Sequence, residues 1–379
     1  MKSSSPNFAD SVLHWFARHG RKDLPWQQDP TPYRVWVSEI MLQQTQVGTV
    51  IDYYRRFMAR FPDVHSLASA ELDQVLHLWT GLGYYARARN LHKAATLIVA
   101  EYNGEFPANV SALESLPGIG RSTAGAIAAL SMNIRAPILD GNVKRVLTRY
   151  HGIEGWPEQS ANKARLWQLA DALTPDRRVA NYTQAMMDLG AMLCTRSRPD
   201  CGTCPLIDGC IAYKEDRQAE IPGKKPKKAL PVKSVVMYII QNDDGDVMLE
   251  KRPAQGIWGG LYSFPEYEQG PAQALAEPKM TVDWVLHPAQ AKAKAKANKP
   301  GLLSGFPVTE VESESVTELP PLRHTFSHYH LDIIPVHSRI RGRHREFAEP
   351  QRYIWYPLDG SIEVGLAAPI KKLLARLPE

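Results

Sequence analysis

The sequence predicts two regions of different fold class, a mostly α-helical N-terminal region and an α+β C-terminal domain. Between about residues 7 and 213, apolar residues recur at three- and four-residue spacing, as in Val35, Trp36 and Ile40, which is the period of amphipathic helices. After about residue 231, β-branched residues form short runs separated by turn residues, a pattern typical of strands. The 379 residues, 44% hydrophobic and 22% charged, suit a soluble globular protein of two or three domains.

The boundary between the two regions is marked by a Lys-Lys-Pro-Lys-Lys segment at residues 224–228, which is too polar to pack and poorly suited to a helix. Strands are expected at residues 232–240 and 247–250, because the Asn-Asp-Asp-Gly sequence between them is a strong turn signal. The stretch from about 270 to 300 is rich in Ala, Pro and Lys and predicts a long exposed loop or a loosely held helix. The expected boundaries are 1–223 for the helical region, 224–231 for the linker and 232–379 for the C-terminal domain.

The net charge of +5 is weak evidence about a partner, because it suits a polyanion and equally a surface that is merely soluble. Basic residues do lie beside candidate sites, with Lys144 and Arg145 after an Asp-Gly-Asn sequence and Arg196 and Arg198 between cysteines. The chain has no apolar run near the roughly 18 residues of a membrane span, and residues 1–10 lack the apolar core of a signal peptide. We therefore expect a cytoplasmic protein with no membrane partner.

All four cysteines lie close together, in the order C-x6-C-x2-C-x5-C. Two disulfides are a poor interpretation, because disulfide-stapled domains are usually small and this chain is long enough for an ample hydrophobic core. Four thiolates in one short loop suit either tetrahedral zinc or a [4Fe–4S] cluster. The long first gap departs from the paired C-x2-C sequences of structural zinc, so the spacing favours iron–sulfur and leaves zinc open. The candidate ligands are Cys194, Cys201, Cys204 and Cys210.

A Leu-Pro-Gly-Ile-Gly sequence ending at Gly120 lies between two helical stretches and allows a tight hairpin. Backbone amides at the start of the following helix can bind a phosphate oxygen, although any αα-hairpin can use such glycines for its geometry alone. Asp140 then opens an Asp-Gly-Asn-Val-Lys-Arg sequence, where its simplest role is to cap the next helix.

Taken together, the hairpin, Asp140 and the cysteine pattern resemble the helix-hairpin-helix DNA glycosylases of the endonuclease III superfamily, over roughly residues 7–215. The resemblance implies two helical lobes, double-stranded DNA as the partner and a [4Fe–4S] cluster held in the loop 194–210. It also implies that Gly118 and Gly120 contact the DNA backbone, with Arg121 beside them, and that Asp140 acts on the sugar.

Glu39 is the second candidate catalytic residue. A carboxylate among apolar neighbours is costly unless it is paired or protonated, and a protonated carboxyl in a pocket is a general acid; an exposed helical glutamate is the alternative. The Glu-x-Met-Leu-Gln-Gln-Thr-Gln sequence that Glu39 begins, with Leu-Pro-Trp upstream and Gly-Leu-Gly-Tyr-Tyr downstream, resembles the MutY adenine DNA glycosylases. The resemblance implies that Glu39 protonates adenine at N7 and positions the water, while Asp140 stays charged and stabilises the cationic sugar.

The residue two positions beyond the second hairpin glycine separates members of the superfamily. Bifunctional relatives have a lysine there, whose amine forms a Schiff base with the sugar, and some MutY relatives have a tyrosine that assists the sugar chemistry. Ser122 occupies this position, so the resemblance implies a monofunctional enzyme and leaves any direct role of Ser122 open. We expect Lys144 to contact phosphate, and Asn142 to orient Asp140 and the water.

The MutY resemblance also implies how the base leaves the helix. Gln43 and Tyr84 would wedge into the duplex, whereas Trp26 and Gln184 would line the adenine pocket. For Trp26 and Tyr84, an ordinary place in the hydrophobic core is the alternative.

Two sequences in the C-terminal domain, Trp-Gly-Gly-Leu-Tyr-Ser-Phe-Pro and His-Thr-Phe-Ser-His-Tyr-His-Leu, resemble the Nudix-like domain of MutY proteins. No Arg-Glu-x-x-Glu-Glu box is present, so we do not expect hydrolysis of nucleoside diphosphates. The resemblance implies that Phe326, Ser327 and His328 recognise 8-oxoguanine opposite the adenine. A metal site at His324, His328 and His330 is a weaker alternative, because no acid accompanies these histidines.

The expected protein is therefore a monomeric base-excision-repair glycosylase acting on A·8-oxoguanine or A·G pairs in duplex DNA. One alternative is a bifunctional pyrimidine glycosylase/lyase on the same scaffold, against which Ser122 and the C-terminal domain argue. The other is a non-enzymatic iron–sulfur protein that binds DNA or senses redox state, which would not need Glu39 and Asp140 together. The sequence offers no motif that identifies a protein partner.

Overall fold

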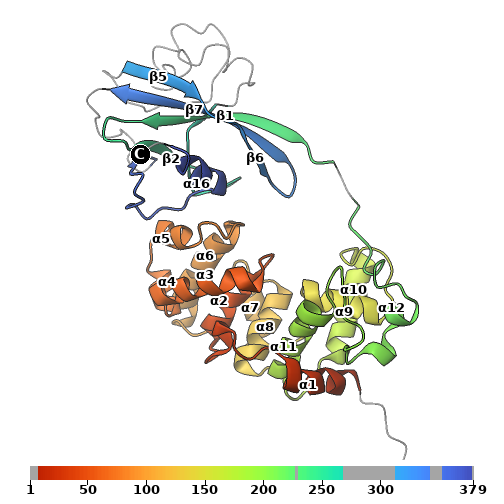
Figure 1. Cartoon of the computed structure of the whole chain (residues 1–379). Coiled ribbons are helices and arrows are strands. Elements are labelled where there is room, and N and C mark those ends of the chain that lie inside the picture. The colour runs from red at the N-terminus through yellow and green to blue at the C-terminus, as the bar shows by residue number, and fades with distance from the viewer. Residues whose placement is uncertain (1–6, 227–228, 268–311, 342–351, 378–379) are drawn as a thin grey trace, which may run out of the picture. The chain divides into compact units, whose positions relative to one another are not determined.

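The structure is a computed structural model that describes residues 7–226, 229–267, 312–341 and 352–377 (Figure 1). Packing divides the chain into two compact units, which are described separately. The first contains Met1–Ala70 and Arg87–Lys227, and the second contains Glu71–Ala86 and Lys228–Glu379. The division differs from the expected boundaries in the segment Glu71–Ala86, which groups with the C-terminal residues. The loop or helix expected at 270–300, and Lys227 and Lys228 of the expected linker, lie outside the described residues.

The first unit is helical, as predicted from the spacing of its apolar residues (Figure 1). Polar residues at several helix starts accept a hydrogen bond from an unpaired backbone amide of the first turn, which fixes where the helix begins. Asn7, Thr31 and Asp140 each do so. The helices are α1 (Phe8–His19), α2 (Pro32–Leu42), α3 (Val47–Arg60), α4 (Val64–Ala68), α6 (Ala86–Tyr102), α7 (Val110–Ser115), α8 (Arg121–Met132), α9 (Gly141–Tyr150), α10 (Ser160–Leu173), α11 (Val179–Asp188) and α12 (Ile211–Lys214), with the short turns η1 (Pro25–Gln27), η2 (Leu189–Leu193) and η3 (Ile207–Gly209).

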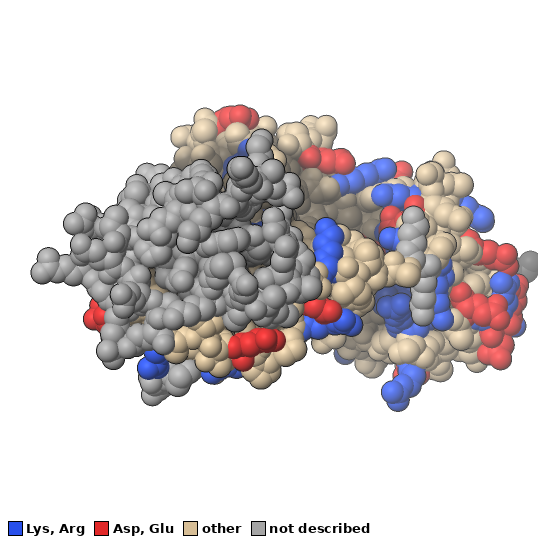
Figure 2. All heavy atoms as spheres, turned by 90° about the horizontal axis from the view of Figure 1, so that it is seen from above, with Lys and Arg blue, Asp and Glu red and all other residues tan. Residues whose placement is uncertain are grey.

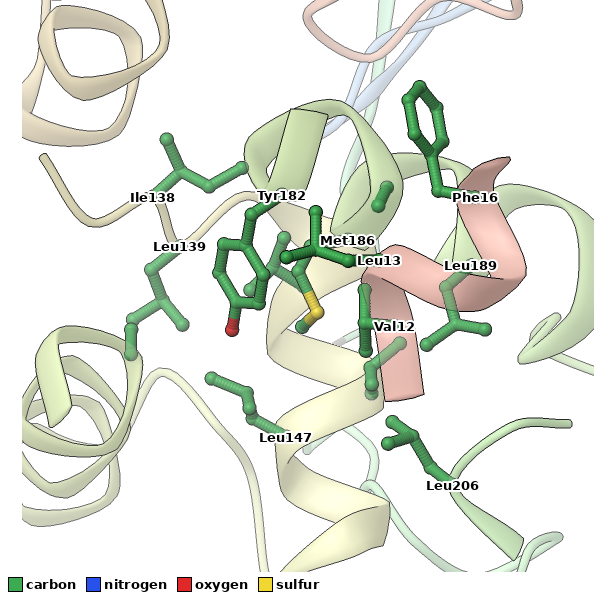
Figure 3. Packing of buried hydrophobic residues seen from close by; sticks show 14 of the residues in the cluster. Val12, Leu13, Phe16, Ile138, Leu139, Leu147, Tyr182, Met186, Leu189 and Leu206 are labelled. Carbon is green, nitrogen blue, oxygen red and sulfur yellow. The ribbon is translucent and has the colours of Figure 1, made fainter. Parts of the chain in front are cut away.

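One hydrophobic cluster joins the first helix of this unit to the helices that precede the cysteines (Figure 3). Val12 and Leu13 of α1 pack with Met186 of α11, and Leu139 and Leu147 bring the start and middle of α9 into the same cluster. Each such side chain contributes about 1.5–3 kcal/mol when it is fully buried. The cluster therefore fixes Asp140, which lies between Leu139 and α9, relative to α11.

The second unit contains a mixed β-sheet with the strand order β3-β2-β1-β7-β5. β1 and β7 are parallel neighbours, with Val232 opposite His330, whereas the other strand pairs are antiparallel. β6 also pairs with β7, β4 with β1 and β8 with β2. The strands are β1 (Val232–Gln241), β2 (Val247–Lys251), β3 (Tyr262–Ser263), β4 (Glu266–Tyr267), β5 (Glu312–Glu318), β6 (Leu322–Thr325), β7 (His330–Arg341) and β8 (Tyr353–Tyr356).

The expected hairpin between the first two strands is confirmed. Gln241 pairs with Val247 across the turn, and Gly245 has a φ of 87°, a left-handed value that favours glycine. The predicted strands at 232–240 and 247–250 thus match β1 and β2 within a residue at each end.

Among its described residues, the second unit has the helices α5 (Leu72–Leu78) and α16 (Ala368–Leu374). The segment that contains α5 is bound to the residues before α16: the Tyr85 hydroxyl donates to the Leu366 carbonyl (2.8 Å), and the Leu366 amide donates to the Thr80 hydroxyl (3.3 Å). Gly365 lies so close that a Cβ there would be 2.6 Å from the Cβ of Leu76. These contacts explain why residues 71–86 pack with C-terminal strands that follow them far along the chain.

Candidate active site

A cavity of about 420 Å³ in the first unit brings together side chains from η1, α2, α8, α9 and α11. Its lining contains the two candidate catalytic carboxyls, Glu39 and Asp140, which come from helices about a hundred residues apart in the sequence. It also contains six further residues singled out from the sequence or beside them: Trp26, Gln43, Gln44, Ser122, Asn142 and Gln184. The predicted convergence of Glu39 and Asp140 on one cavity is therefore present in the structure.

Glu39 lies near the end of α2, between the buried residues Ser38 and Ile40. The pKa of its carboxyl is raised from 4.5 to about 8, mainly by burial and in part by the nearby negative charge of Asp140. The carboxyl is therefore protonated in neutral solution. An ordinary exposed helical glutamate, the alternative interpretation, does not describe this environment.

Asp140 is the N-cap of α9, and its Oδ1 accepts a hydrogen bond from the Val143 amide (2.8 Å). Burial raises the pKa of this carboxyl, but the Val143 amide, the positive charge of Arg145 and the Asn142 amide act in the opposite direction. Glu39 has no comparable cationic or amide partner that lowers its pKa. When the pair carries one negative charge, the charge therefore resides on Asp140. Asp140 can both cap α9 and act in catalysis, because the cap uses its Oδ1 and leaves its Oδ2 available.

Arg145 links the start of α9 to the beginning of the cysteine loop. Its guanidinium donates to the Asn142 Oδ1 (2.8 Å), the Gly190 carbonyl (2.6 Å) and the Cys194 carbonyl (2.6 Å). A Cβ at Gly190 would lie 2.6 Å from the Cβ of Asn142, so the close approach of η2 to α9 requires glycine there. In the sequence Arg145 stands out only as a basic residue; its three-residue spacing from Asn142 on a helix was the available signal.

Two residues that line another side of the cavity, Arg21 and Gln184, are held by the buried carboxylate of Asp188. Asp188 is fully buried and accepts hydrogen bonds from the Arg21 amide (2.8 Å), from the Arg21 guanidinium (2.6 and 2.9 Å) and from Gln184 Nε2 (2.8 Å). The last bond fixes the Gln184 amide with its nitrogen towards Asp188. The sequence analysis missed Arg21 and Asp188, because no local pattern connects residues this far apart.

Trp26 satisfies both interpretations that the sequence left open. It is 6% exposed and packs edge-on against Tyr54, with ring centroids 5.5 Å apart, as a core residue would. It also lines the cavity. A buried aromatic face beside two carboxyls is suited to contact a planar base.

The two wedge candidates differ in their surroundings. Gln43 lines the cavity and its Nε2 donates to the Thr123 hydroxyl (3.4 Å), whereas the next residue, Gln44, is exposed and has a left-handed φ of 58°. Tyr84, in the second unit, is 52% exposed, so the core alternative is wrong for this residue. The sequence analysis did not single out Gln44, whose backbone conformation no residue pattern indicated.

The predicted hairpin is formed between α7 and α8. Gly118 has a φ of 78° and is exposed, and Gly120 is the N-cap of α8 without a side-chain cap. The Ser122 hydroxyl accepts from the Leu139 amide (3.0 Å), which ties α8 to the strand-like segment before Asp140. The first amides of α8 therefore have no side-chain acceptor at the cap, as an anion-binding helix start requires.

The two basic residues expected at DNA both have partners within the protein. The Arg121 guanidinium lies over the Trp167 ring, 4.0 Å from its centroid, and the Lys144 Nζ forms an ion pair with Glu158. On the described surface visible in Figure 2, Lys and Arg side chains form several groups with Asp and Glu groups between them, rather than one uniform basic field.

The four cysteines are free and partly buried, so the disulfide alternative is not formed. The pKa of the Cys204 thiol is raised to about 11, mainly by burial and in part by the charges of Cys194, Cys210 and Cys201. In the described part of the chain, no three His, Cys, Asp or Glu side chains stand close enough together to hold a metal ion. The loop thus supplies four soft donors of the type that iron–sulfur clusters and zinc prefer, without ligand geometry.

Arg149, which is 3% exposed, holds this loop from α9. Its guanidinium donates to the Sγ of Cys194 (3.4 Å) and to the carbonyls of Thr195, Arg196, Gln218 and Ile221. Arg149 therefore ties the start of the cysteine loop to α9.

The loop Phe326–His328, which is expected to recognise 8-oxoguanine, lies between β6 and β7 of the second unit. Phe326 is half-buried against the rings of His324, Tyr329 and Trp258, with centroids 4.5, 4.7 and 5.3 Å away. Ser327 and His328 are exposed, and the loop is closed by a bond from the Phe326 amide to the Tyr329 carbonyl (2.9 Å).

Comparisons with known proteins agree with these features. Residues 37–171 match the family model of the HhH-GPD superfamily base excision DNA repair proteins, and residues 235–376 match that of the NUDIX domain. An adenine DNA glycosylase of Buchnera aphidicola is 39% identical over 97% of this chain and 96% of its own length. An adenine DNA glycosylase of Mus musculus is 42% identical, with 70% of this chain and 61% of its own length covered.

Among solved structures, a thermostable thymine-DNA glycosylase matches with a TM-score of 0.50 and 27% identity, over 55% of this chain and 95% of that chain. No helix in the described ranges has both the length and the apolar character needed to cross a membrane. The family resemblance and both predicted fold classes are confirmed, and the chain belongs to the MutY-type adenine DNA glycosylases, which are DNA glycosylase enzymes of the HhH-GPD superfamily.

Proposed function

We propose that the protein is a monofunctional base-excision-repair enzyme that hydrolyses the N-glycosidic bond of adenine opposite 8-oxoguanine or guanine in duplex DNA. The observation that carries the proposal is the shared cavity of Glu39 and Asp140, in which burial raises the pKa of Glu39 to about 8. One carboxyl that is protonated in neutral solution and a second that is ionised form the pair that acid-assisted glycoside hydrolysis needs.

The chemistry follows from the two protonation states. Adenine leaves poorly as an anion, so Glu39 donates its proton to N7 as the C1′–N9 bond breaks. Asp140, whose ionised form the Val143 amide and Arg145 favour against the effect of burial, stabilises the positive charge that develops on the sugar. A water oxygen then bonds to C1′ and its proton returns to Glu39, which restores the enzyme. Asn142 lines the cavity beside Asp140 and is proposed to orient this carboxylate and the water.

The proposal of hydrolysis without strand cleavage rests on the amines near the cavity. None of the described residues that line it is a lysine, and the position of the lyase lysine in bifunctional relatives is occupied by Ser122, whose hydroxyl accepts from Leu139. Lys144 lies nearby on α9, but its amine is paired with Glu158. An ammonium in an ion pair is a poor nucleophile, because only the neutral amine attacks the sugar.

DNA engagement is proposed through three groups of the chain. The uncapped start of α8 after Gly120 offers amides to a phosphate, with Gly118 allowing a close approach. Gln43 or the exposed Gln44 would fill the space that the extruded nucleotide leaves, and Tyr84 would assist. Extrusion costs a few kcal/mol, which such contacts offset. Arg121 and Lys144 would contribute positive charge near the backbone while remaining in their internal contacts.

Cys194, Cys201, Cys204 and Cys210 are proposed to bind a [4Fe–4S] cluster. Four thiols in one loop, with the Arg149 cation 3.4 Å from the Sγ of Cys194, suit an anionic thiolate-bound group. When bound, the cluster would cross-link the loop. Because Arg145 donates hydrogen bonds to Cys194 and to Asn142, a loop fixed in this way would also fix the start of α9.

Recognition of 8-oxoguanine is proposed for Phe326, Ser327 and His328. 8-Oxoguanine carries an N7–H donor and a C8 carbonyl where guanine has an acceptor and a C–H. The exposed hydroxyl of Ser327 and imidazole of His328 can both donate and accept hydrogen bonds, and the ring of Phe326 offers a stacking surface. We further propose that the enzyme acts as a monomer on chromosomal DNA in the cytoplasm.

The proposal is tested by single-turnover excision on duplexes with A·8-oxoguanine, A·G, A·T and thymine glycol. We expect abasic sites, revealed by alkali, with rates in the order A·8-oxoguanine, A·G, A·T, and no strand cleavage before alkali. Excision of thymine glycol with borohydride trapping would instead establish the bifunctional pyrimidine enzyme. DNA binding without base release would establish a non-enzymatic protein. Iron and sulfide analysis of the same preparation separates a cluster from zinc.

A further inference from the structure

A second cavity, of about 430 Å³, lies directly behind the catalytic one and has no part in the mechanism above. Three residues line both cavities: Arg21, Trp26 and Gln184. These side chains therefore form the partition between the two spaces. The far side of the second cavity, here called the rear cavity, is lined by the exposed residues Ala17 and Arg178, so it reaches solvent.

The three side chains of the partition are held in different ways. Arg21 and Gln184 are both fixed by hydrogen bonds to the buried carboxylate of Asp188. Trp26 belongs to the three-residue turn η1 and packs against Tyr54 through an edge-on ring contact. A ring contact is worth about 0.5–1.5 kcal/mol and has no strict geometry, whereas the buried ion pair is costly to break. Trp26 is thus the part of the partition whose displacement leaves the buried ion pair intact.

The lining of the rear cavity suits a free purine base. Phe16, Val35 and Leu130 offer apolar surface to the faces of a planar ring, and the amide of Asn181 can pair with its polar edge. The volume exceeds that of one such base. The described residues that line the rear cavity include the cations Lys22 and Arg178 and no carboxylate. The electron-rich nitrogens of the ring therefore meet no negative charge there.

We propose that the rear cavity is the exit route and transient binding site of the adenine released by cleavage, which rests on the function proposed above. After the C1′–N9 bond breaks, the abasic sugar remains joined to its strand and continues to occupy the mouth of the catalytic cavity. The base, neutral after it accepts a proton from Glu39, has no covalent link to the DNA. A displacement of Trp26 opens a path to solvent that does not require the duplex to leave.

The test fills the rear cavity without altering the catalytic one. Ala17→Trp and Ala180→Trp place a large ring in the rear cavity, and neither residue lines the catalytic cavity. Ala161→Trp on α10 is the matched control, because Ala161 is also a helical alanine and is exposed outside both cavities. In single-turnover reactions with base-labelled A·8-oxoguanine duplex, abasic sites and free adenine are measured separately, the latter after rapid gel filtration of the complex.

We expect wild type and Ala161→Trp to release free adenine as fast as abasic sites form. The two filled variants should form abasic sites at the wild-type rate but release adenine at least about tenfold more slowly, a change worth about 1.4 kcal/mol in the release barrier. Adenine that leaves the filled variants as fast as abasic sites form would overturn the exit route.

A second measurement on the unaltered protein covers the case in which a filled variant fails to fold. Labelled free adenine is exchanged into a preformed complex with a duplex that carries a stable abasic-site analogue. Exchange faster than duplex dissociation supports a route that bypasses the DNA, and exchange only at the rate of duplex dissociation contradicts it. This assay needs no excision, so its outcome is separate from that of the proposed function, which fails if no adenine mispair yields abasic sites.

Discussion

The proposed catalytic cavity and the proposed recognition loop Phe326–His328 differ in how far their polar side chains are exposed to water. In the cavity, Glu39 and Asp140 are only partly exposed, and burial raises the pKa of both. In the loop, Ser327 and His328 remain exposed. General acid catalysis needs a carboxyl that is still protonated at neutral pH. Burial raises the carboxyl pKa and so provides this, at a cost in folding free energy. Recognition needs donors and acceptors that can exchange water for a base edge, and exposure provides that.

The largest expected effect is that of Glu39→Gln on base release. The amide keeps the size of the side chain but cannot donate an acid proton, so we expect single-turnover excision to fall by about 10²–10⁴-fold, the typical loss of a general acid. Duplex binding, measured by fluorescence anisotropy, should be retained. Glu114→Gln on α7 is the matched control, because Glu114 is an exposed helical glutamate, and it should leave the rate unchanged. Near-normal excision by Glu39→Gln would show that Glu39 is not the general acid and that its burial in the cavity does not serve catalysis.

Burial of the Glu39 carboxyl should also make the free energy of unfolding depend on pH. The pKa of Glu39 is raised from 4.5 in the unfolded chain to about 8 in the folded protein. Below the lower value both states are protonated and burial of the acid carries no ionisation cost. As pH rises from 4.5 towards 8, the unfolded chain loses the proton and the folded protein keeps it, so stability falls; above about 8 the loss is complete.

Glu39→Gln removes this titration, so the variant should be more stable than wild type at pH 8, by on the order of a few kcal/mol in the free energy of unfolding. The difference should shrink towards zero near pH 4.5. Urea denaturation at a series of pH values measures it. A difference that stays constant across this range would show that the carboxyl is not perturbed by burial.

Ser327→Ala should have a smaller effect, limited to discrimination. Loss of one hydrogen bond to the damaged base costs about 0.5–1.5 kcal/mol, which corresponds to a few-fold to about tenfold decrease in the preference for A·8-oxoguanine over A·G. The rate of cleavage at saturating enzyme should not change, since Ser327 does not line the catalytic cavity. Ser361→Ala is a control at another exposed loop serine of the second unit. An equal loss on both duplexes would assign Ser327 to general DNA binding rather than to recognition of the damage.

Local sequence was sufficient for much of the fold and for the centre of the site. Periodicity predicted the helices of the first unit, and the Asn-Asp-Asp-Gly turn predicted the pairing of β1 with β2. Glu39 and Asp140 were each conspicuous in their own segment, Glu39 as an acid among apolar residues and Asp140 at a helix start. Their convergence could not be calculated from spacing and was expected only through resemblance to a family.

What the sequence could not predict depends on contacts between distant segments. The Arg21–Asp188 pair joins residues 167 positions apart, and each is an ordinary charged residue in its local context. The exposure of Gln44 depends on a left-handed φ of 58° that glutamine does not favour. The assignment of Glu71–Ala86 to the second unit depends on contacts with Leu366 and Gly365, which no helical pattern in that segment indicates.

The smallest expected effect concerns this last segment. Lys251 Nζ of β2 lies 2.7 Å from Asp73 Oδ2 of α5, and both side chains are about one-third exposed. Partial exposure screens such a pair, so a double-mutant cycle with Lys251→Met and Asp73→Asn should give a coupling of about 0.2–1 kcal/mol. The cycle is measured by urea denaturation of the full chain. A coupling in this range would show that the ion pair helps to hold α5 against β2 within the second unit, although the chain on either side of the segment belongs to the first unit. A coupling of zero in both low and high salt would mean that the hydrogen bonds of Leu366 and the close packing of Gly365 hold the segment in the second unit without help from the ion pair.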